Sequence, residues 1–327
     1  MQFAKSPISV VLSVVLVAYM AIHARAEQKE TGLLLERIMP PSGAFLAPLL
    51  IPRAPGTDGN KRVQAQLRAW FKSLGWHEMV HESVQPTPHG PTTFTNLVFT
   101  RNPRAKKRII LAAHFDSKIT AVGQSRDYEF IGATDSAAPC AMIVELCHAL
   151  SGLPVNDEVT LQAVFFDGEE AFVNWTATDS LYGSRQLAAL WKEGVQPAGV
   201  NGAPHWSLDN IDWFILLDLL GAANPTIPLF GLTPEPLFKK MMDVERALTS
   251  VRRIHKDPTT SGISSYFRYR PVTADYTAIA DDHLPFFELG LRRILHLIPA
   301  PFPRVWHRIE DDVTALDGPT IADLTLI

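Results

Sequence analysis

The sequence predicts a single α/β domain with a mainly parallel central sheet and helices on both faces. Short apolar runs recur along the chain, which is typical of buried strands. Five runs are expected strands: Asn96–Thr100, Arg108–Ala113, Leu161–Phe166, Trp213–Leu220 and Ile294–Ile298. Helix-like segments lie between several of them, at Ala137–Leu150, Ser180–Trp191 and Leu237–Leu248. Strands that alternate with helices indicate a parallel sheet that is covered on both faces.

The length and composition agree with one globular unit. The chain has 327 residues, of which 46% are apolar and 20% charged. No internal repeat or long linker divides it, and α/β folds of this length often form one unit. The formal net charge of −4 provides no basic stripe, so we expect no nucleic acid partner.

The first residues have the pattern of a cleavable signal peptide. Lys5 precedes an apolar run of fifteen residues, Ile8 to Ile22, and Ala24-Arg25-Ala26 places small residues at a cleavage site. A membrane span needs about 20 apolar residues, so a signal anchor is the less favoured alternative. We therefore expect a signal peptide at 1–26 and one catalytic domain at 27–327. The mature protein is expected in the secretory lumen or outside the cell, with no membrane association after cleavage.

The cysteines and one sequon bear on this secretory assignment. Cys140 and Cys147 are seven positions apart in a predicted helix, which separates them by about 10 Å of helix rise. That distance is too long for a disulfide, so we expect two buried free thiols. Asn174-Trp175-Thr176 is a glycosylation sequon, and we expect Asn174 to point outward and to be modified at least partly.

Polar residues collect where the predicted strands end. In parallel sheets, ligands bind at the carboxyl edge of the strands. The residues at or near that edge are His114, Asp116, Asp135, Glu169, Glu170, Asp218 and His307. Several also have an ordinary interpretation: Asp135 as a helix N-cap, Asp218 as a turn residue, His307 as a surface histidine, and the two glutamates as an exposed acidic turn.

Taken together, these residues favour a catalytic zinc site. Carboxylate and imidazole ligands with an open coordination position suit zinc. A metal ion also explains two adjacent carboxylates at the mouth of a buried strand, because they repel each other unless a positive charge lies between them. One glutamate can then bind the metal while its neighbour acts as a base toward substrate.

The order of these residues resembles that of zinc aminopeptidases with a two-metal site. The wider sequence resembles more closely the glutaminyl-peptide cyclotransferases, or glutaminyl cyclases, of animals and fungi. The similar segments run from about Leu34 to Asp317. They are LLIPRAPGTDGN, AAHFDSK, GATDSAAPCAMIVEL, FFDGEEAFVNWTATDSLYGSRQLA, LLDLLGAANPT, ADDHLPF and LHLIPAPFPRVWH.

This resemblance implies an enzyme with a zinc aminopeptidase-like fold and one zinc ion per chain. The implied zinc ligands are Asp135, Glu170 and His307. The implied substrates are peptides or proteins with an N-terminal glutamine, which become pyroglutamyl products as ammonia is released. We expect the enzyme to be a monomer.

The resemblance also implies the roles of the residues around the metal. Glu169 is the expected general acid and base, and Asp218 and Asp281 are the expected hydrogen-bonded acidic pair beside it. The expected walls of the substrate pocket are Trp175, Phe302 and Trp306.

Two other functions stay open at this stage. A secreted aminopeptidase with two zinc ions is the main alternative, because His114 and Asp218 match the extra ligands and Asp135 would bridge. A non-enzymatic ectodomain would have lost ligands or the base, and none is missing.

At the C-terminal end of the chain, we expect a terminal helix to begin only about where the segment GPTIADLTLI stops.

Overall fold

The computed structural model of the chain describes residues 37–39, 43–119, 130–255, 265–269 and 279–327. The predicted signal peptide at 1–26 lies outside the described residues, and its boundary stays a prediction. Within the described part of the chain, no helix is both long and apolar enough to cross a membrane.

The described strands and helices follow the alternation that the sequence predicts. The strands are β1 (His77–Thr87), β2 (Gly90–Thr100), β3 (Lys107–His114), β4 (Val159–Phe166), β5 (Ile211–Leu217), β6 (Ile227–Pro228), β7 (Phe267–Arg268) and β8 (Ile294–Leu297). The α-helices are α3 (Asp58–Ser73), α4 (Ala138–Leu150), α5 (Tyr182–Glu193), α6 (Glu235–Ser250), α8 (Leu284–Glu288) and α9 (Gly318–Leu326).

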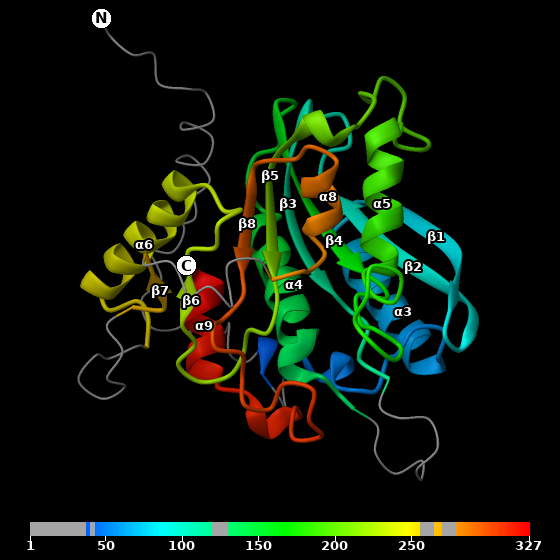
Figure 1. Cartoon of the computed structure of the whole chain (residues 1–327). Coiled ribbons are helices and arrows are strands. Elements are labelled where there is room, and N and C mark those ends of the chain that lie inside the picture. Colours follow the sequence, from blue (N-terminus) through cyan, green and yellow to red (C-terminus); the bar gives the residue numbers. More distant parts are fainter. Residues whose placement is uncertain (1–36, 40–42, 120–129, 256–264, 270–278) are drawn as a thin grey trace, which may run out of the picture.

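Six strands form the central sheet in the order β1-β2-β4-β3-β5-β8. The strands β4, β3, β5 and β8 run parallel, whereas β2 is antiparallel to both β1 and β4. Figure 1 shows the β1–β2 hairpin at one edge of the sheet and β8 at the other. The mainly parallel α/β fold is therefore confirmed, with an antiparallel hairpin added at one edge.

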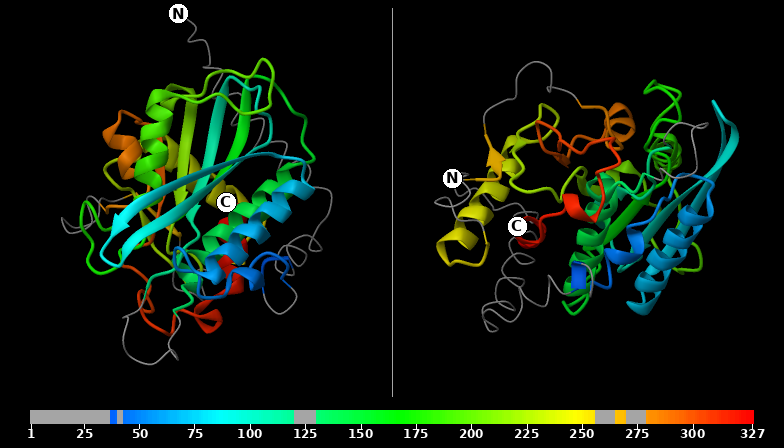
Figure 2. Two further views of the ribbon diagram at one scale, coloured as in Figure 1. Left: turned by 90° about the vertical axis from the view of Figure 1, so that its right-hand side faces the viewer. Right: turned by 90° about the horizontal axis from the view of Figure 1, so that it is seen from below.

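Helices cover both faces of this sheet. On one face, α3, α4, α6 and α9 pack over strand residues such as Leu111 and Phe165. On the other face, α5 and α8 pack over the strand residues that come next in the sequence, such as Ala112 and Phe166. Successive strand residues point to opposite faces, so a strand covered on both sides must be apolar throughout. The left view of Figure 2 shows α3 beside the long β1–β2 ribbon.

The buried cysteines agree with the sequence analysis, but the C-terminal segment does not. Cys140 and Cys147 are both free and buried in α4. The segment expected to precede a terminal helix is already helical as α9. Asp317 caps α9 by accepting a hydrogen bond from the Thr320 backbone N at 2.9 Å, and Ile321 is fully buried. The expectation was wrong because it weighed neither this cap nor the apolar side chains that follow it.

A hollow with an apolar lining lies on the α4 and α6 side of the sheet. Its volume is about 290 Å³, and Leu111, Trp213, Leu150 and Met241 are among its lining residues. None of the predicted site residues lines it. This cavity is therefore separate from the polar residues at the strand ends.

Candidate active site

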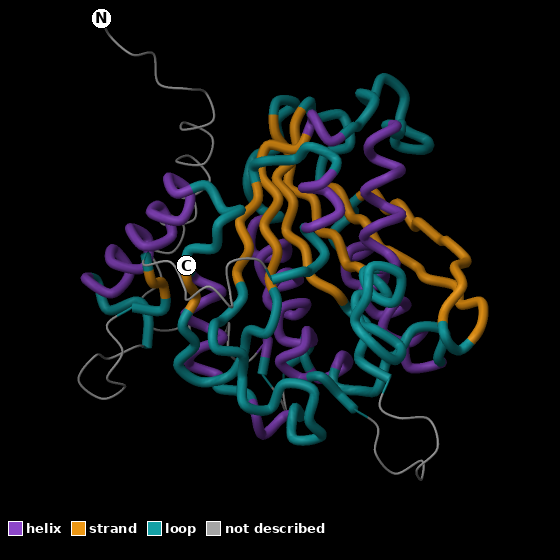
Figure 3. Tube along the Cα trace, in the orientation of Figure 1, coloured by secondary structure: helices purple, strands orange, loops and turns teal. Residues whose placement is uncertain are grey.

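The site lies at the carboxyl ends of the parallel strands. Figure 3 shows loops gathered where β3, β4, β5 and β8 end. His114 is the last residue of β3, the Glu169–Glu170 pair follows β4, and Asp218 follows β5. Parallel strands end at one edge of a sheet, so residues far apart in the sequence meet there.

A tight turn after β4 presents the two adjacent glutamates. Gly168 has a φ of 73°, and a Cβ at this position would come within 2.3 Å of the Phe94 ring. Only glycine fits such a conformation and such close packing. The Asp116 carboxylate accepts hydrogen bonds from the backbone N atoms of Glu169 at 3.2 Å and Glu170 at 3.3 Å. The acidic turn is thus buried and fixed, and it is not an exposed surface turn.

Asp135, Glu170 and His307 form a compact group of possible metal ligands. One ligand atom from each lies within 4.8 Å of the others. His307 Nε2 is 3.1 Å from Glu170 Oε1 and 3.5 Å from Asp135 Oδ2. The side chains of Asp135 and Glu170 are buried, whereas that of His307 is partly exposed. The structure thus brings together all three residues that the sequence analysis proposed as zinc ligands.

The chemistry of this group fits a zinc ion. Asp135 Oδ2 and Glu170 Oε1 are buried, and neither accepts a hydrogen bond among the described residues. Buried anionic oxygens without a donor are costly, so a cation between them relieves a real deficit. The other oxygen of Glu170 lies 3.1 Å from Lys118 Nζ, which leaves Oε1 to face the group. One nitrogen and two oxygens also form a donor set that zinc accepts.

A second group of possible ligands adjoins the first and shares Asp135 with it. His114, Asp135 and Asp218 also place ligand atoms within 4.8 Å of one another. His114 Nε2 is 3.0 Å from Asp135 Oδ1 and 3.4 Å from Asp218 Oδ1. Asp135 thus presents a different oxygen to each group. Ligand identity and position alone therefore permit two metals.

Glu169 belongs to neither group, although its carboxyl lies in the same buried environment. It is 6% exposed, and burial raises its pKa well above the ordinary range. The charge of His114 opposes this rise in pKa, whereas the charges of Glu170 and Asp281 add to it. A carboxyl with a raised pKa can take up and return a proton near neutral pH, which suits a general acid and base.

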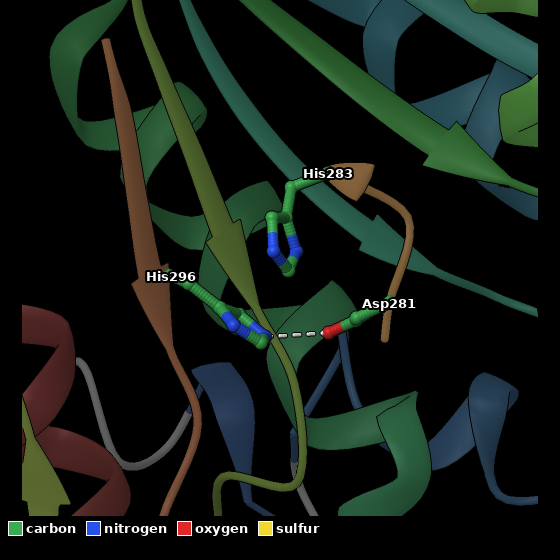
Figure 4. A group of neighbouring side chains, drawn as sticks. All are labelled: Asp281, His283 and His296. Atoms are coloured by element: carbon green, nitrogen blue, oxygen red, sulfur yellow. Dashed lines mark hydrogen bonds and ion pairs between the residues drawn. The ribbon is translucent and has the colours of Figure 1, made fainter. Parts of the chain in front are cut away.

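Asp281 lies in a buried group with two histidines (Figure 4). His296 Nε2 is 2.6 Å from Asp281 Oδ2, and the rings of His283 and His296 are 4.2 Å apart between centroids. Burial and then the charge of Asp218 raise the pKa of Asp281, so the two aspartates are electrostatic neighbours. A direct Asp218–Asp281 hydrogen bond stays a prediction.

The predicted aromatic walls come from two different segments. Phe302 and Trp306 have ring centroids 4.8 Å apart, and the Trp306 ring stacks on His307 at 4.1 Å. Trp175 lies on the separate loop that follows Glu170. Trp175 is 43% exposed and Trp306 39% exposed, which is unusual for indole rings that serve only the core. The neighbouring Asn174 is exposed as expected, and its glycosylation stays a prediction.

The sequence analysis missed several supporting residues of this site. It assigned no role to Lys118, which pairs with Glu170, or to the Asp116 carboxylate, which accepts hydrogen bonds from the acidic turn. It also overlooked His296, a polar residue within the otherwise apolar strand β8. A buried polar residue in an apolar strand needs a partner, and that pattern could have marked His296.

The chain matches known proteins in sequence along most of its length. Residues 96–327 match the family model of peptidase family M28. The chain is 40% identical over 295 residues to the glutaminyl-peptide cyclotransferase of Bothrops jararaca, covering 86% of this chain and 77% of that protein. It is 36% identical over 302 residues to that of Dictyostelium discoideum, covering 85% of this chain and 80% of that protein.

Solved structures agree with these relationships. The glutaminyl cyclase of Macrostomum lignano superposes with a TM-score of 0.74 and 32% identity, covering 92% of this chain and 90% of that one. A leucine aminopeptidase precursor from Bacteroides thetaiotaomicron has the same fold, with a TM-score of 0.67 and 20% identity over 86% of this chain and 92% of that one. The chain belongs to peptidase family M28 and, within it, to the glutaminyl-peptide cyclotransferases.

Proposed function

We propose that this chain converts the N-terminal glutamine of peptides and proteins to pyroglutamate with release of ammonia. The observation that carries this proposal is the buried Asp135, Glu170 and His307 group with Glu169 directly beside it. The glutaminyl-peptide cyclotransferase relatives, at up to 40% identity along most of the chain, support the same reaction.

One zinc ion is the proposed cofactor, with Asp135 Oδ2, Glu170 Oε1 and His307 Nε2 as its ligands. Two of these atoms are the buried oxygens that lack a hydrogen-bond donor, which supports the assignment. When bound, zinc supplies Lewis acidity that makes a carboxamide carbon more electrophilic.

Glu169 moves the proton in this reaction. The α-amine of the substrate attacks the side-chain carboxamide carbon and forms a five-membered lactam. Glu169 removes a proton from the attacking amine and delivers it to the nitrogen that leaves as ammonia. No water is consumed, because the nucleophile and the electrophile belong to one molecule. Holding the side chain folded back therefore supplies much of the rate.

Two aspartates support Glu169 in this proposal. Asp218 and Asp281 are neighbouring carboxyls, and this pair sets the charge environment of Glu169. Burial and then the charge of Asp218 raise the pKa of Asp281, which supports the proximity of the two groups.

The bonding of Asp218 supports a single metal. Its Oδ1 atom, which faces His114, already accepts hydrogen bonds from the Ser136 hydroxyl and from the Leu219 backbone N at 2.8 Å. An oxygen with two donors is a poor ligand for a second cation. Asp218 would be a metal ligand in the two-zinc aminopeptidase alternative, and we therefore favour one zinc per chain.

Trp175, Phe302 and Trp306 form the walls that enclose the folded-back glutamine side chain. The Trp306 ring stacks on His307, which supports its proposed role as a wall beside the metal group. The proposed enzyme is a monomer. Its proposed location, after removal of residues 1–26, is the secretory pathway or the outside of the cell, which the apolar run Ile8 to Ile22 supports.

Product analysis tests the reaction directly. The purified chain is incubated with a peptide that begins with glutamine and with a matched peptide that begins with leucine. We expect one ammonia per glutaminyl peptide and a product that is lighter by one ammonia, with the leucyl peptide unchanged. Release of free glutamine or free leucine would show that the chain is an aminopeptidase.

A further inference from the structure

The loop of residues 171–180 connects the acidic turn to helix α5 and carries Trp175. It begins directly after Glu170, and its two ends are joined because the Leu181 backbone N donates to the Glu169 carbonyl at 2.9 Å. The side chains of residues 173–178 are exposed, so packing contributes little to the conformation of the middle of the loop. Other interactions must hold it in place.

The carboxylate of Asp179 is the centre of those interactions. Oδ1 accepts hydrogen bonds from the Phe172 backbone N and from the Tyr182 hydroxyl, both at 2.8 Å. Oδ2 accepts hydrogen bonds from the backbone N atoms of Val173 and Asn174, both at 3.0 Å. One buried side chain thus satisfies three consecutive backbone donors immediately before Trp175.

These hydrogen bonds also connect the loop to the protein core. Tyr182 stacks on Phe94 with centroids 4.5 Å apart, and Phe172 contacts the Tyr182 ring at 5.6 Å. Burial opposes ionisation of Asp179, but the hydrogen bonds from Phe172 and its neighbours lower its pKa below the ordinary value. The group is therefore a charged acceptor at neutral pH, and hydrogen bonds to charged groups are the stronger class.

We propose that Asp179 is a positioning residue for substrate binding: its carboxylate fixes the 171–180 loop and thereby holds the Trp175 indole at the pocket. Among the described residues, the Asp179 carboxylate bonds to neither the metal group nor Glu169, so its effect is exerted through Trp175. The inference rests on the proposed function, because it takes Trp175 as a wall of the substrate pocket.

The variant Asp179→Asn tests this role with minimal change in shape. Its amide nitrogen cannot accept hydrogen bonds, so two of the four bonds to this side chain are lost. We expect KM for a glutaminyl peptide to rise by up to about tenfold, which is what one lost aromatic contact is worth. Turnover at saturating substrate and zinc content should be unchanged.

A double-mutant cycle with Trp175→Ala separates positioning from a general effect on stability. Trp175→Ala alone should raise KM, and adding Asp179→Asn to it should raise KM no further. The control is Asp157→Asn, which alters an exposed carboxylate bonded to Asn102 at the opposite end of the strands and should leave KM unchanged. If Asp179→Asn does not fold, Tyr182→Phe removes one donor from the same carboxylate, and its smaller rise in KM should likewise vanish beside Trp175→Ala.

The outcomes of the cycle distinguish failure of the inference from failure of the proposed function. Additive effects of the two substitutions on KM, or a loss of turnover or zinc in Asp179→Asn, would overturn the positioning role. An unchanged KM in Trp175→Ala would instead show that Trp175 does not contact substrate, and this would also contradict the positioning role of Asp179. Absence of pyroglutamate formation by the unmodified chain would refute the proposed function itself.

Discussion

Glu169 and Glu170 are adjacent in the sequence, yet their side chains have different surroundings. Glu170 contacts Lys118 through one oxygen and faces His307 with the other. Glu169 is absent from both groups of possible ligands, and burial raises its pKa. Consecutive residues at a strand end point in different directions, so one can face the metal while its neighbour faces substrate.

Matched substitutions at these two positions should therefore have different effects. Glu170→Gln removes an anionic ligand, so bound zinc should decrease and some activity should return with excess zinc. Glu169→Gln should retain zinc and melting temperature, yet turnover should fall by at least roughly 10²–10⁴-fold, as is typical of a lost general acid and base. Zinc analysis and turnover of the two variants measure this. Loss of zinc from Glu169→Gln, with zinc retained in Glu170→Gln, would reverse the assignment.

Lys118 should tune the zinc affinity through Glu170. Its Nζ is 3.1 Å from Glu170 Oε2, and Lys118 is the charge partner that keeps this ligand oriented. We expect Lys118→Met to weaken zinc binding by about 10- to 100-fold, as is usual when a partner of a metal ligand is lost. Competition with a chelator measures the affinity, and Lys118→Arg is the control that preserves the charge. Equal affinities for Lys118→Met and the unmodified chain would exclude this role.

At the residue scale, the sequence predicts the groups that lie at strand ends better than the groups that support them. The end of a strand is visible as the end of an apolar run, and His114, Glu169 and Asp218 were found in this way. Asp179 and Lys118 could not be found by this reasoning, because their roles depend on the path of a loop. Hydrogen bonds to backbone donors leave no periodic pattern in a sequence.

At the scale of elements, α9 shows how a short helix gains stability from packing. Ile321 is fully buried in the core shared with α4, whereas Leu324 is only half-buried on the same helix. A helix of nine residues is not stable alone, so these tertiary contacts must hold it.

Truncating Ile321 should therefore destabilise the protein without affecting its chemistry. Ile321→Ala should lower the free energy of unfolding by about 2–5 kcal/mol, because it removes a buried side chain and leaves a cavity. Leu324→Ala should cost less, and both variants should retain turnover per folded enzyme below the melting transition. Urea unfolding measures the difference. Equal losses of stability would mean that α9 does not pack as described.

The strands and helices were predictable to different degrees for physical reasons. The buried strands β3, β4, β5 and β8 are continuous apolar runs, so they were identified within a few residues. The edge strand β1 mostly alternates between exposed and half-buried residues, and its few apolar residues are interspersed with polar ones, so it lacked that signal. The order of the strands was not predictable from one sequence, because it depends on contacts between distant segments.

At the scale of the whole molecule, the sheet brings two groups of possible metal ligands together around Asp135. A leucine aminopeptidase precursor and a Zn-dependent exopeptidase share this fold, so the fold does not decide between one metal and two. The hydrogen bonds that Asp218 accepts from Ser136 and Leu219 favour one metal. We therefore propose that one zinc is sufficient for pyroglutamate formation.

Stepwise return of zinc to the metal-free protein tests this claim most directly. Zinc is removed with a chelator, and measured equivalents are added back while turnover is followed on a glutaminyl and a leucyl peptide. We expect activity on the glutaminyl peptide to reach its maximum at one zinc per chain, with no activity on the leucyl peptide at any ratio. A maximum at two zinc ions per chain, accompanied by hydrolysis of the leucyl peptide, would contradict the account.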